Sequence, residues 1–332
     1  MTHRAQCDGR PRAGPKPRVL LADDHRPIID RVSSLLSDDF DVVGLFTDGR
    51  QAVDAAPTVA PDVIVLDINM PGLDGFQTMR ALEQSGSRAP VVFLSLHDAE
   101  DYVVEAFRCG ARGYVLKREL VQDLSGALDQ VLQGRMFAPS LRSLYRLGDG
   151  TGASHAMQLY GDVPTFLDGL AAFFDMALRH GDATCIAATE DVREGLRARL
   201  RDRGWDVGGT PRHDRCLFLD AREVLNRFMR NGLPDAELLS ELVAELDDFR
   251  RAVANNATSG LTMFGNMVVS LIASGNAEGT IALEKQWNAL THDRPYFTLC
   301  GYATSCFHNG SADLWSRVCA EHWAVSQVSD LD

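Results

Sequence analysis

Acidic residues, a hydroxyl and a lysine follow short apolar runs in the first half of the chain. The residues in question are Asp23, Asp24, Asp67, Ser95 and Lys117. Because the carboxyl ends of parallel strands meet at one rim of a sheet, we expect these side chains to converge in one crevice. Three neighbouring carboxylates repel one another, which raises their pKa values unless a cation joins them. Mg²⁺ suits such a site because it accepts few carboxylates and keeps several waters.

A carboxylate beside Mg²⁺ and an ammonium group can attack phosphorus, since both cations stabilise the charge on a transferring phosphoryl group. The sequence therefore predicts an acyl phosphate on one aspartate. Asp67 is the candidate, because it follows a central run and precedes the rigid turn 69–72, Asn-Met-Pro-Gly. Aspartate at a strand end is often only a helix cap, and a lone serine is often a turn residue. The prediction depends on the whole set of residues.

The elements that must position this set follow from the hydrophobic pattern. Five apolar runs are too short and too continuous for amphipathic helices, and are typical of strands buried on both faces. They lie at 19–22, 42–46, 63–66, 91–94 and 114–116. Segments of helical period alternate with them, at 27–37, 50–56, 75–84, 99–108 and 119–133. This alternation predicts a doubly wound α/β domain with a parallel sheet.

Residues 18–137 resemble the receiver domain of two-component response regulators, CheY-like and of the LuxR class, through the motifs LLADDH, VLDINMPGLDG, FLSLHD and GARGYVLK. The resemblance implies a flavodoxin-like (βα)5 fold. It also implies phosphorylation by a sensor histidine kinase or a phosphotransfer protein. The implied roles are Mg²⁺ binding by Asp23, Asp24, Asp67 and the Asn69 carbonyl, phosphoryl contacts from Ser95 and Lys117, and a switch at Tyr114. In that switch the aromatic ring turns inward when the serine moves toward the phosphate; simple packing on a helix is the alternative.

Composition narrows the remaining possibilities. The 332 residues carry 33 basic and 46 acidic side chains, a net charge of −13, and both halves of the chain are acidic. Non-specific nucleic-acid binding is therefore disfavoured. None of the three lysines follows a glycine-rich turn, so no P-loop is present. No apolar stretch is long enough for a membrane span or a signal peptide, and seven scattered cysteines indicate reduced thiols, so we expect a cytoplasmic protein.

Beyond the receiver-like part we expect a linker at 138–154 and a second α/β domain at 155–326, flanked by a disordered arm at 1–17 and a tail at 327–332. Within the second domain the period of 263–274 favours a helix. Cys300, Cys306, His308, Cys319 and His322 suggest zinc. Their spacing matches no common finger, however, and favours structural thiols and ordinary histidines.

Several pieces of the second domain resemble the MEDS (methanogen/methylotroph sensory) domain. They are His155…Tyr160-Gly-Asp162, GDATCIAATEDVREGLRARLRDRGWDV, LFLDAREVLNRFMRNGLPD, MFGNMVVSLIASGNAEGTIALEKQWNAL and YFTLCGY. The resemblance implies a RecA/KaiC-like fold without a P-loop and a module that senses small organic molecules. Candidate ligand-binding residues are His155, Tyr160 and Asn266. The family pattern R-x-F-G-E-M here reads T-M-F-G-N-M at 262–267, so both charges are absent and sensing would be altered or lost.

The sequence therefore predicts a response regulator, a phosphoacceptor rather than an enzyme, whose second domain acts through protein interaction or ligand sensing. A DNA-binding transcriptional regulator is one alternative, and a salt-dependent gel shift distinguishes it. The helix that contains Arg193, Arg197 and Arg201 is the most basic stretch, but interleaved acids favour a solvated face with ion pairs. A small-molecule sensor modulated by the receiver is the other alternative.

Overall fold

The computed structural model describes residues 14–148, 154–207, 215–253, 259–307 and 312–327. The chain divides into two compact units, unit 1 at Met1–Pro139 and unit 2 at Ser140–Asp332. Most of the expected arm, up to residue 13, and the expected tail from residue 328 lie outside the described residues. Within the described ranges, no helix combines the length and apolar character that crossing a membrane requires.

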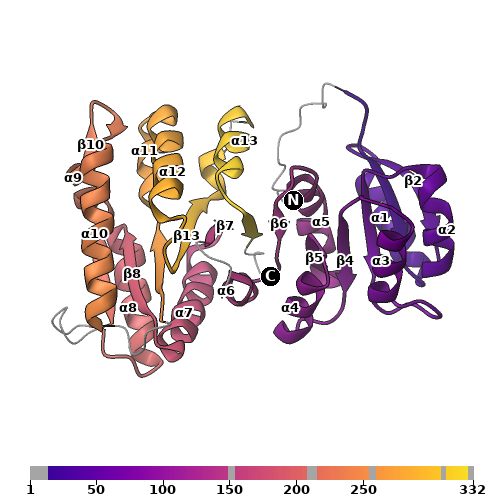
Figure 1. The fold of residues 1–332 in the computed structure, drawn as a ribbon, viewed down its shortest axis with the longest axis horizontal. Helices are drawn as coiled ribbons and strands as arrows, with labels where there is room; N and C mark the ends of the chain where they lie inside the picture. Colours follow the sequence, from indigo (N-terminus) through magenta and orange to yellow (C-terminus); the bar gives the residue numbers. More distant parts are fainter. Residues whose placement is uncertain (1–13, 149–153, 208–214, 254–258, 308–311, 328–332) are drawn as a thin grey trace. The chain divides into compact units, whose positions relative to one another are not determined.

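Unit 1 alternates strands and helices as the hydrophobic pattern predicts (Figure 1). Its elements are β1 (Arg18–Ala22), α1 (Arg26–Leu36), β2 (Asp41–Phe46), α2 (Gly49–Val59), β3 (Val63–Asp67), α3 (Gly75–Gln84), β4 (Val91–Ser95), α4 (Glu100–Arg108), β5 (Gly113–Leu116), the short 3₁₀ helix η1 (Lys117–Glu119), α5 (Leu120–Leu132) and β6 (Met136–Phe137). The strands are parallel, in the order β2-β1-β3-β4-β5-β6.

Helices α1 and α5 pack on the same hydrophobic core of this sheet. Alternate residues of the strands, such as Val65 and Val115, share a core with Ile29 and Val32 of α1 and Leu124 of α5. β3 and β4 are buried along their whole length, which explains why their sequences are continuously apolar instead of alternating. The five strands and five helices expected from the sequence are confirmed; the two-residue strand β6 was not expected.

The stretch 138–154, expected as a linker, contains a helix, α6 (Leu141–Gly148), so that expectation is wrong there. Leu141, Leu144 and Tyr145 lie on one face of the helix and are buried. The Tyr145 hydroxyl donates to Asp182 Oδ2 at 2.7 Å and lies 3.2 Å from His180 Nδ1, so α6 packs as part of unit 2. Residues 149–153 lie outside the described ranges.

Unit 2 is a second α/β unit (Figure 1). After α6 it contains β7 (Ser154–Tyr160), α7 (Val163–His180), β8 (Ala183–Ala188), α8 (Glu190–Asp202), β9 (Cys216–Asp220), α9 (Ala221–Phe228), β10 (Met229–Arg230), β11 (Leu233–Pro234), α10 (Ala236–Val253), β12 (Leu261–Gly265), α11 (Met267–Ala273), α12 (Ala277–Thr291), β13 (Tyr296–Ala303), the 3₁₀ helix η2 (Thr304–Phe307), α13 (Ala312–Ala320) and β14 (Ala324–Gln327). Its parallel strands run in the order β14-β7-β13-β12-β8-β9.

The helix expected at 263–274 is wrong in its first part. Residues 261–265 form β12, which pairs on both sides, with β8 and with β13, and the helix begins only at Met267. A short apolar run fits a buried strand and a buried helical segment equally well, and pairing in the middle of the sheet decides between them. The RecA/KaiC-like resemblance of unit 2 stays a prediction.

Candidate functional site

The parallel strands of unit 1 bring the predicted acidic residues to one rim of the sheet. Asp23 directly follows β1, Asp67 ends β3, Ser95 ends β4, and Lys117 follows β5 as the first residue of η1. Ala22 pairs with Leu66 and Asp67 with Leu94, so the strands end nearly level with one another. The convergence expected from the sequence therefore follows from the register of the sheet.

The ammonium group of Lys117 lies between two buried carboxylates. Its Nζ is 2.7 Å from Asp23 Oδ2 and 2.9 Å from Asp67 Oδ2. Asp23 is fully buried and Asp67 nearly so, whereas Asp24 is exposed. One carboxylate oxygen from each aspartate lies within 4.8 Å of the others, close enough for one cation to contact all three.

Burial shifts the protonation equilibria of this cluster. Desolvation raises the pKa of Asp67; the hydrogen bond from Lys117 opposes the rise and the charge of Asp23 adds to it. Burial alone would lower the pKa of Lys117, but its two carboxylate partners outweigh that effect and the pKa is raised. The ammonium group therefore stays charged, and repulsion between the acids remains for a further cation to relieve.

This donor set fits Mg²⁺. Three carboxylate oxygens from two strand ends are hard ligands, and the exposed Asp24 leaves one side open to water, which Mg²⁺ retains. The backbone N–H of Asn69 donates to Asp67 Oδ1 at 3.3 Å, and the Asn69 side chain lies 2.9 Å from His97 Nε2. The role of the Asn69 carbonyl as a metal ligand stays a prediction.

Helix α3 packs unusually close to the end of β3. A Cβ atom at Gly75 would lie 2.5 Å from the carbonyl oxygen of Asp67 and 2.8 Å from Ile68 Cα, so only glycine fits there. The Gly75 N–H donates to the Ile68 carbonyl at 2.8 Å. A capping box between Asp74 and Gln77 begins the helix at this point. This contact fixes the backbone that presents the Asp67 side chain.

Tyr114 lies inward in this structure. Its ring is fully buried, and its hydroxyl donates to the carbonyl oxygen of His97 at 2.8 Å. The backbone N–H of His97 in turn donates to Ser95 Oγ at 3.0 Å. Burial raises the pKa of Tyr114 to about 12, so the hydroxyl keeps its proton and remains a donor. The loop after β4 thus connects the serine to the aromatic residue through one hydrogen-bonded segment.

The three predicted ligand-binding residues of unit 2 do not form one group. Tyr160 stacks on Phe166 with ring centroids 4.0 Å apart, and a hydrogen bond to Asn266 lowers its pKa against a larger rise caused by burial. Asn266 Oδ1 accepts from the Thr189 N–H at 3.1 Å. His155, five positions before Tyr160 on β7, contacts a different set of residues. All three predicted residues are buried.

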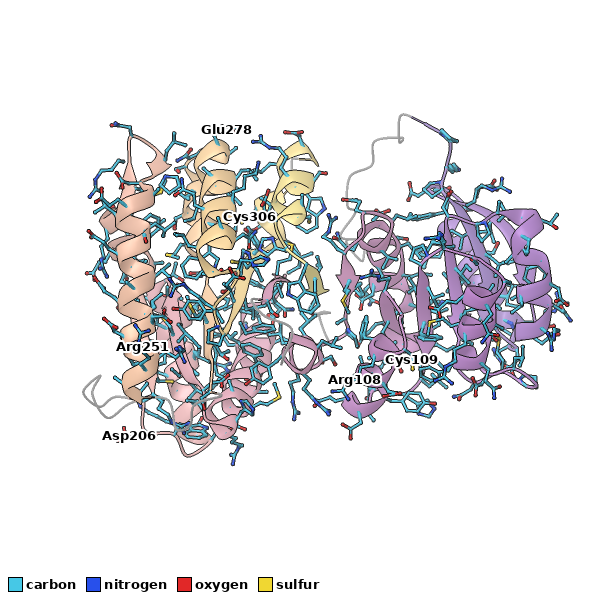
Figure 2. The ribbon with its side chains drawn as sticks, in the orientation of Figure 1. Arg108, Cys109, Asp206, Arg251, Glu278 and Cys306 are labelled. Atoms are coloured by element: carbon cyan, nitrogen blue, oxygen red, sulfur yellow. The ribbon has the colours of Figure 1, made fainter. Side chains whose placement is uncertain are left out.

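The partners of His155 are one glutamate that the sequence did not single out and two residues of the cysteine and histidine group. Glu284, Cys300 and His322 each place one ligand atom within 4.8 Å of the others and of a His155 nitrogen. Two of them belong to the cysteine and histidine group that suggested zinc. The other three members of that group lie elsewhere. Cys319 contacts Met157, and Cys306, which is labelled in Figure 2, lies in η2 after β13. His308 lies outside the described residues.

Sequence comparison with known domains divides the chain in the same two parts. The response regulator receiver domain matches residues 19–129. The MEDS domain, described as the methanogen/methylotroph, DcmR sensory domain, matches residues 154–317. The chain belongs to the response regulators. The rim of β1, β3, β4 and β5 in this response regulator is thus part of its receiver domain.

Relatives of this response regulator match mainly its receiver part. Nitrate/nitrite response regulator protein NarL of Escherichia coli K12 is 38% identical over 120 residues, which are 36% of this chain and 56% of NarL. The Fimbriae Z protein of Salmonella typhimurium is 30% identical over 161 residues, 47% of this chain and 77% of that protein. A LuxR-family two-component response regulator from Aurantimonas, with a solved structure, is 27% identical; the match covers 40% of this chain and 95% of that chain, with a TM-score of 0.37. The chain spans little more than half the length of NarL.

Proposed function

We propose that this response regulator accepts a phosphoryl group on Asp67 from a sensor histidine kinase or a phosphotransfer protein, with Mg²⁺ held by Asp23, Asp24, Asp67 and the Asn69 carbonyl. The observation that supports this most directly is the position of the Lys117 ammonium group between two buried carboxylates. A buried cation that contacts the attacking carboxylate is placed to stabilise negative charge on a phosphoryl group. The protein would act as a phosphoacceptor rather than an enzyme.

In this proposal a carboxylate oxygen of Asp67 forms a bond to phosphorus while the bond between phosphorus and the donor's nitrogen breaks. Mg²⁺ supplies charge neutralisation at the phosphoryl oxygens when it is bound. Lys117 already contacts Asp67 Oδ2 and needs only a small movement to pair with a phosphoryl oxygen. Ser95 Oγ, which accepts from the His97 N–H, would donate its own hydrogen to another phosphoryl oxygen.

The switch in this proposal acts through the loop after β4 and helix α4. A shift of Ser95 toward the phosphoryl group would pull on His97, whose carbonyl holds the Tyr114 hydroxyl. Leu96, in that loop, is 73% exposed, and Tyr102, on α4, is 37% exposed and packs on the His97 ring. An exposed apolar surface next to the phosphoacceptor suits a partner that recognises one of two receiver states.

We propose that the MEDS unit acts through protein interaction or small-molecule sensing rather than direct DNA binding. Relatives named as transcriptional regulators, such as the transcriptional regulatory protein DesR of Bacillus subtilis, raise the DNA-binding alternative. Against it, three arginines of the basic helix α8 form ion pairs within unit 2. Arg193 pairs with Asp220 at 2.8 Å, Arg197 with Glu194 at 2.7 Å and Arg199 with Asp168 at 2.6 Å. These guanidinium groups are engaged by acids that a phosphate backbone would have to displace.

The phosphorylation proposal is tested with acetyl phosphate, and with candidate kinases, in the presence of Mg²⁺. Intact-mass measurement should show one added phosphoryl group on the wild type, lost on removal of Mg²⁺ with a chelator. Asp67→Asn should add none, while Asp54→Asn, at an exposed position on α2, should behave as the wild type. Labelling of Asp67→Asn at the wild-type level would overturn the assignment.

The output proposal is tested by pull-down of partners and by gel shift, comparing unphosphorylated with phosphorylated protein. Phosphorylation-dependent capture of a protein partner, with no salt-dependent shift of DNA, is expected. A thermal-shift screen against small organic molecules tests the sensing arm. A specific, salt-dependent DNA shift that strengthens on phosphorylation would refute the proposed output.

A further inference from the structure

Unit 2 contains a cluster of four buried side chains that the receiver mechanism does not use. His155 lies on β7, Glu284 on α12, Cys300 on β13, and His322 between α13 and β14. All four are buried, with His322 and Glu284 each 2% exposed. Glu278, an exposed residue labelled in Figure 2, lies in the first turn of the helix that carries Glu284. Metal-ligating residue types are expensive to bury together unless something bonds them.

The hydrogen bonds around the two histidines fix which ring nitrogen faces the cluster. His155 Nδ1 lies 2.7 Å from Asn288 Oδ1, and Asn288 Nδ2 donates to the Glu321 carbonyl at 2.8 Å, which sets the orientation of the amide. His322 Nδ1 lies 2.8 Å from the Val318 carbonyl oxygen. Because both partners are acceptors, each Nδ1 carries the hydrogen and each neutral ring directs the lone pair of Nε2 at the cluster.

Both lone pairs meet the same carboxylate oxygen. Glu284 Oε2 lies 3.3 Å from His155 Nε2 and 3.9 Å from His322 Nε2. The other oxygen, Oε1, accepts a hydrogen bond from the Tyr302 hydroxyl. One ligand atom of each of the four residues therefore faces the same small buried space, a geometry that a single cation can satisfy.

The separations of the four facing atoms match a small tetrahedral metal site. Cys300 Sγ lies 3.1 Å from His155 Nε2 and 3.9 Å from Glu284 Oε2, and all four atoms lie within 4.8 Å of one another. Zinc bonds to nitrogen, oxygen and sulfur at tetrahedral angles place ligand atoms about 3.3–3.8 Å apart. Hard ions such as Mg²⁺ prefer all-oxygen shells, so two imidazoles and a thiol select a softer ion.

We propose that His155 Nε2, His322 Nε2, Cys300 Sγ and Glu284 Oε2 form a closed tetrahedral site for a divalent transition-metal ion, with Zn²⁺ as the occupant. On binding, the Cys300 thiol and any protonated Glu284 carboxyl each release their proton to solvent. Asn288, the Val318 carbonyl and Tyr302 form the second layer that orients three of the four ligands.

The role of this site follows from its burial and its ligand count. Four protein ligands leave no open position for a substrate, which is the arrangement of a structural site rather than a catalytic one. The ion would join β7, α12, β13 and the connection that leads into β14. It would thereby hold β14 against β7.

Metal content of the purified full chain and cobalt substitution test this proposal. Wild type expressed with added zinc should contain about one Zn²⁺ per chain by mass spectrometry of the metal. The chelator-treated full chain, titrated with Co²⁺, should develop the strong visible absorption of tetrahedral cobalt and a sulfur-to-cobalt charge-transfer band in the near ultraviolet. A metal-free wild type that also gives no tetrahedral cobalt spectrum would overturn the site.

Matched cysteine variants identify the sulfur ligand. Cys300→Ser should lose the charge-transfer band and bind Zn²⁺ at least about tenfold more weakly. Cys216→Ser, at a buried cysteine on β9, should keep both properties. Circular dichroism checks that each variant folds, and Glu284→Gln serves as a second test that keeps the sulfur. A charge-transfer band that persists in folded Cys300→Ser, or a folded Glu284→Gln with wild-type cobalt affinity, contradicts the proposal.

Discussion

Asp123 on α5 is a buried acid whose ionisation should control the pH stability of unit 1. It is 1% exposed, and among the described residues its Oδ1 has no hydrogen-bond partner. Burial, with a smaller contribution from the charge of Glu119, raises its pKa from 3.8 to about 7. Because burial raises the pKa of Asp123 in the folded state, protonated Asp123 is compatible with the fold, and the free energy of unfolding of unit 1 is not reduced below about pH 4. As the pH rises through about 7, the folded state must accept the buried charge and this stability is lost.

The magnitude follows from linkage. Each pH unit between the ordinary and the raised pKa is worth about 1.4 kcal/mol, so ionised Asp123 costs the folded unit about 4 kcal/mol. About 2.5 kcal/mol of that loss falls between pH 5 and pH 8. Asp123→Asn does not titrate, so its stability relative to the wild type should rise by about this amount over the same interval.

Amide hydrogen exchange is the suitable assay, because it reports on each unit separately. All four tryptophans lie at or beyond residue 205, in unit 2, so tryptophan fluorescence does not follow unit 1. The free energy of opening should be measured on peptides from β3 and β4 at both pH values, with Asp54→Asn, exposed on α2, as the control. The reasoning would be refuted if the difference in the free energy of opening between the wild type and Asp123→Asn were the same at both pH values within about 0.5 kcal/mol.

Three further predictions concern the receiver rim and unit 2. Lys117→Met should slow acyl-phosphate formation at least about 100-fold in intact-mass time courses, because the attacking carboxylate loses its cation; a rate near wild type would remove lysine from the mechanism. Gly75→Ala should destabilise unit 1 by about 1–3 kcal/mol in hydrogen exchange and also slow phosphorylation, since the new Cβ meets the Asp67 backbone; unchanged protection would contradict this. Tyr145→Phe should cost unit 2 about 1–3 kcal/mol in urea unfolding followed by tryptophan fluorescence, because buried Asp182 loses a donor; an unchanged midpoint would show that the bond contributes nothing.

The receiver fold and its rim were predictable because the signals are local. A run such as 63–66 is buried on both faces, and its length and apolar character alone predict a strand. Once the strands are parallel, residues that follow them share a rim, so the convergence of Asp23, Asp67 and Lys117 needed no coordinates. Tyr114, by contrast, could be named as a switch but its inward position could not, since rotamers depend on neighbours.

Unit 2 was less predictable because its decisive contacts are distant in sequence. Residues 261–265 became a strand only because β8 and β13 pair with both of its edges. Residues 141–148 form a helix because its apolar face packs against unit 2 and its Tyr145 hydroxyl bonds to residues at the end of α7 and in the turn before β8. Composition in these stretches is compatible with either outcome, and tertiary burial selects one.

The sequence by itself determined the alternation of strands and helices in the receiver unit and the identity of the acids at its rim, because periodicity and strand ends are properties of neighbouring residues. Only the tertiary structure placed His155 beside Cys300, which is 145 positions away, and added a glutamate from a helix and a histidine from the last connection. No spacing rule connects residues on four separate elements. Their meeting is set by sheet order and helix packing, which are determined by the burial of the whole unit.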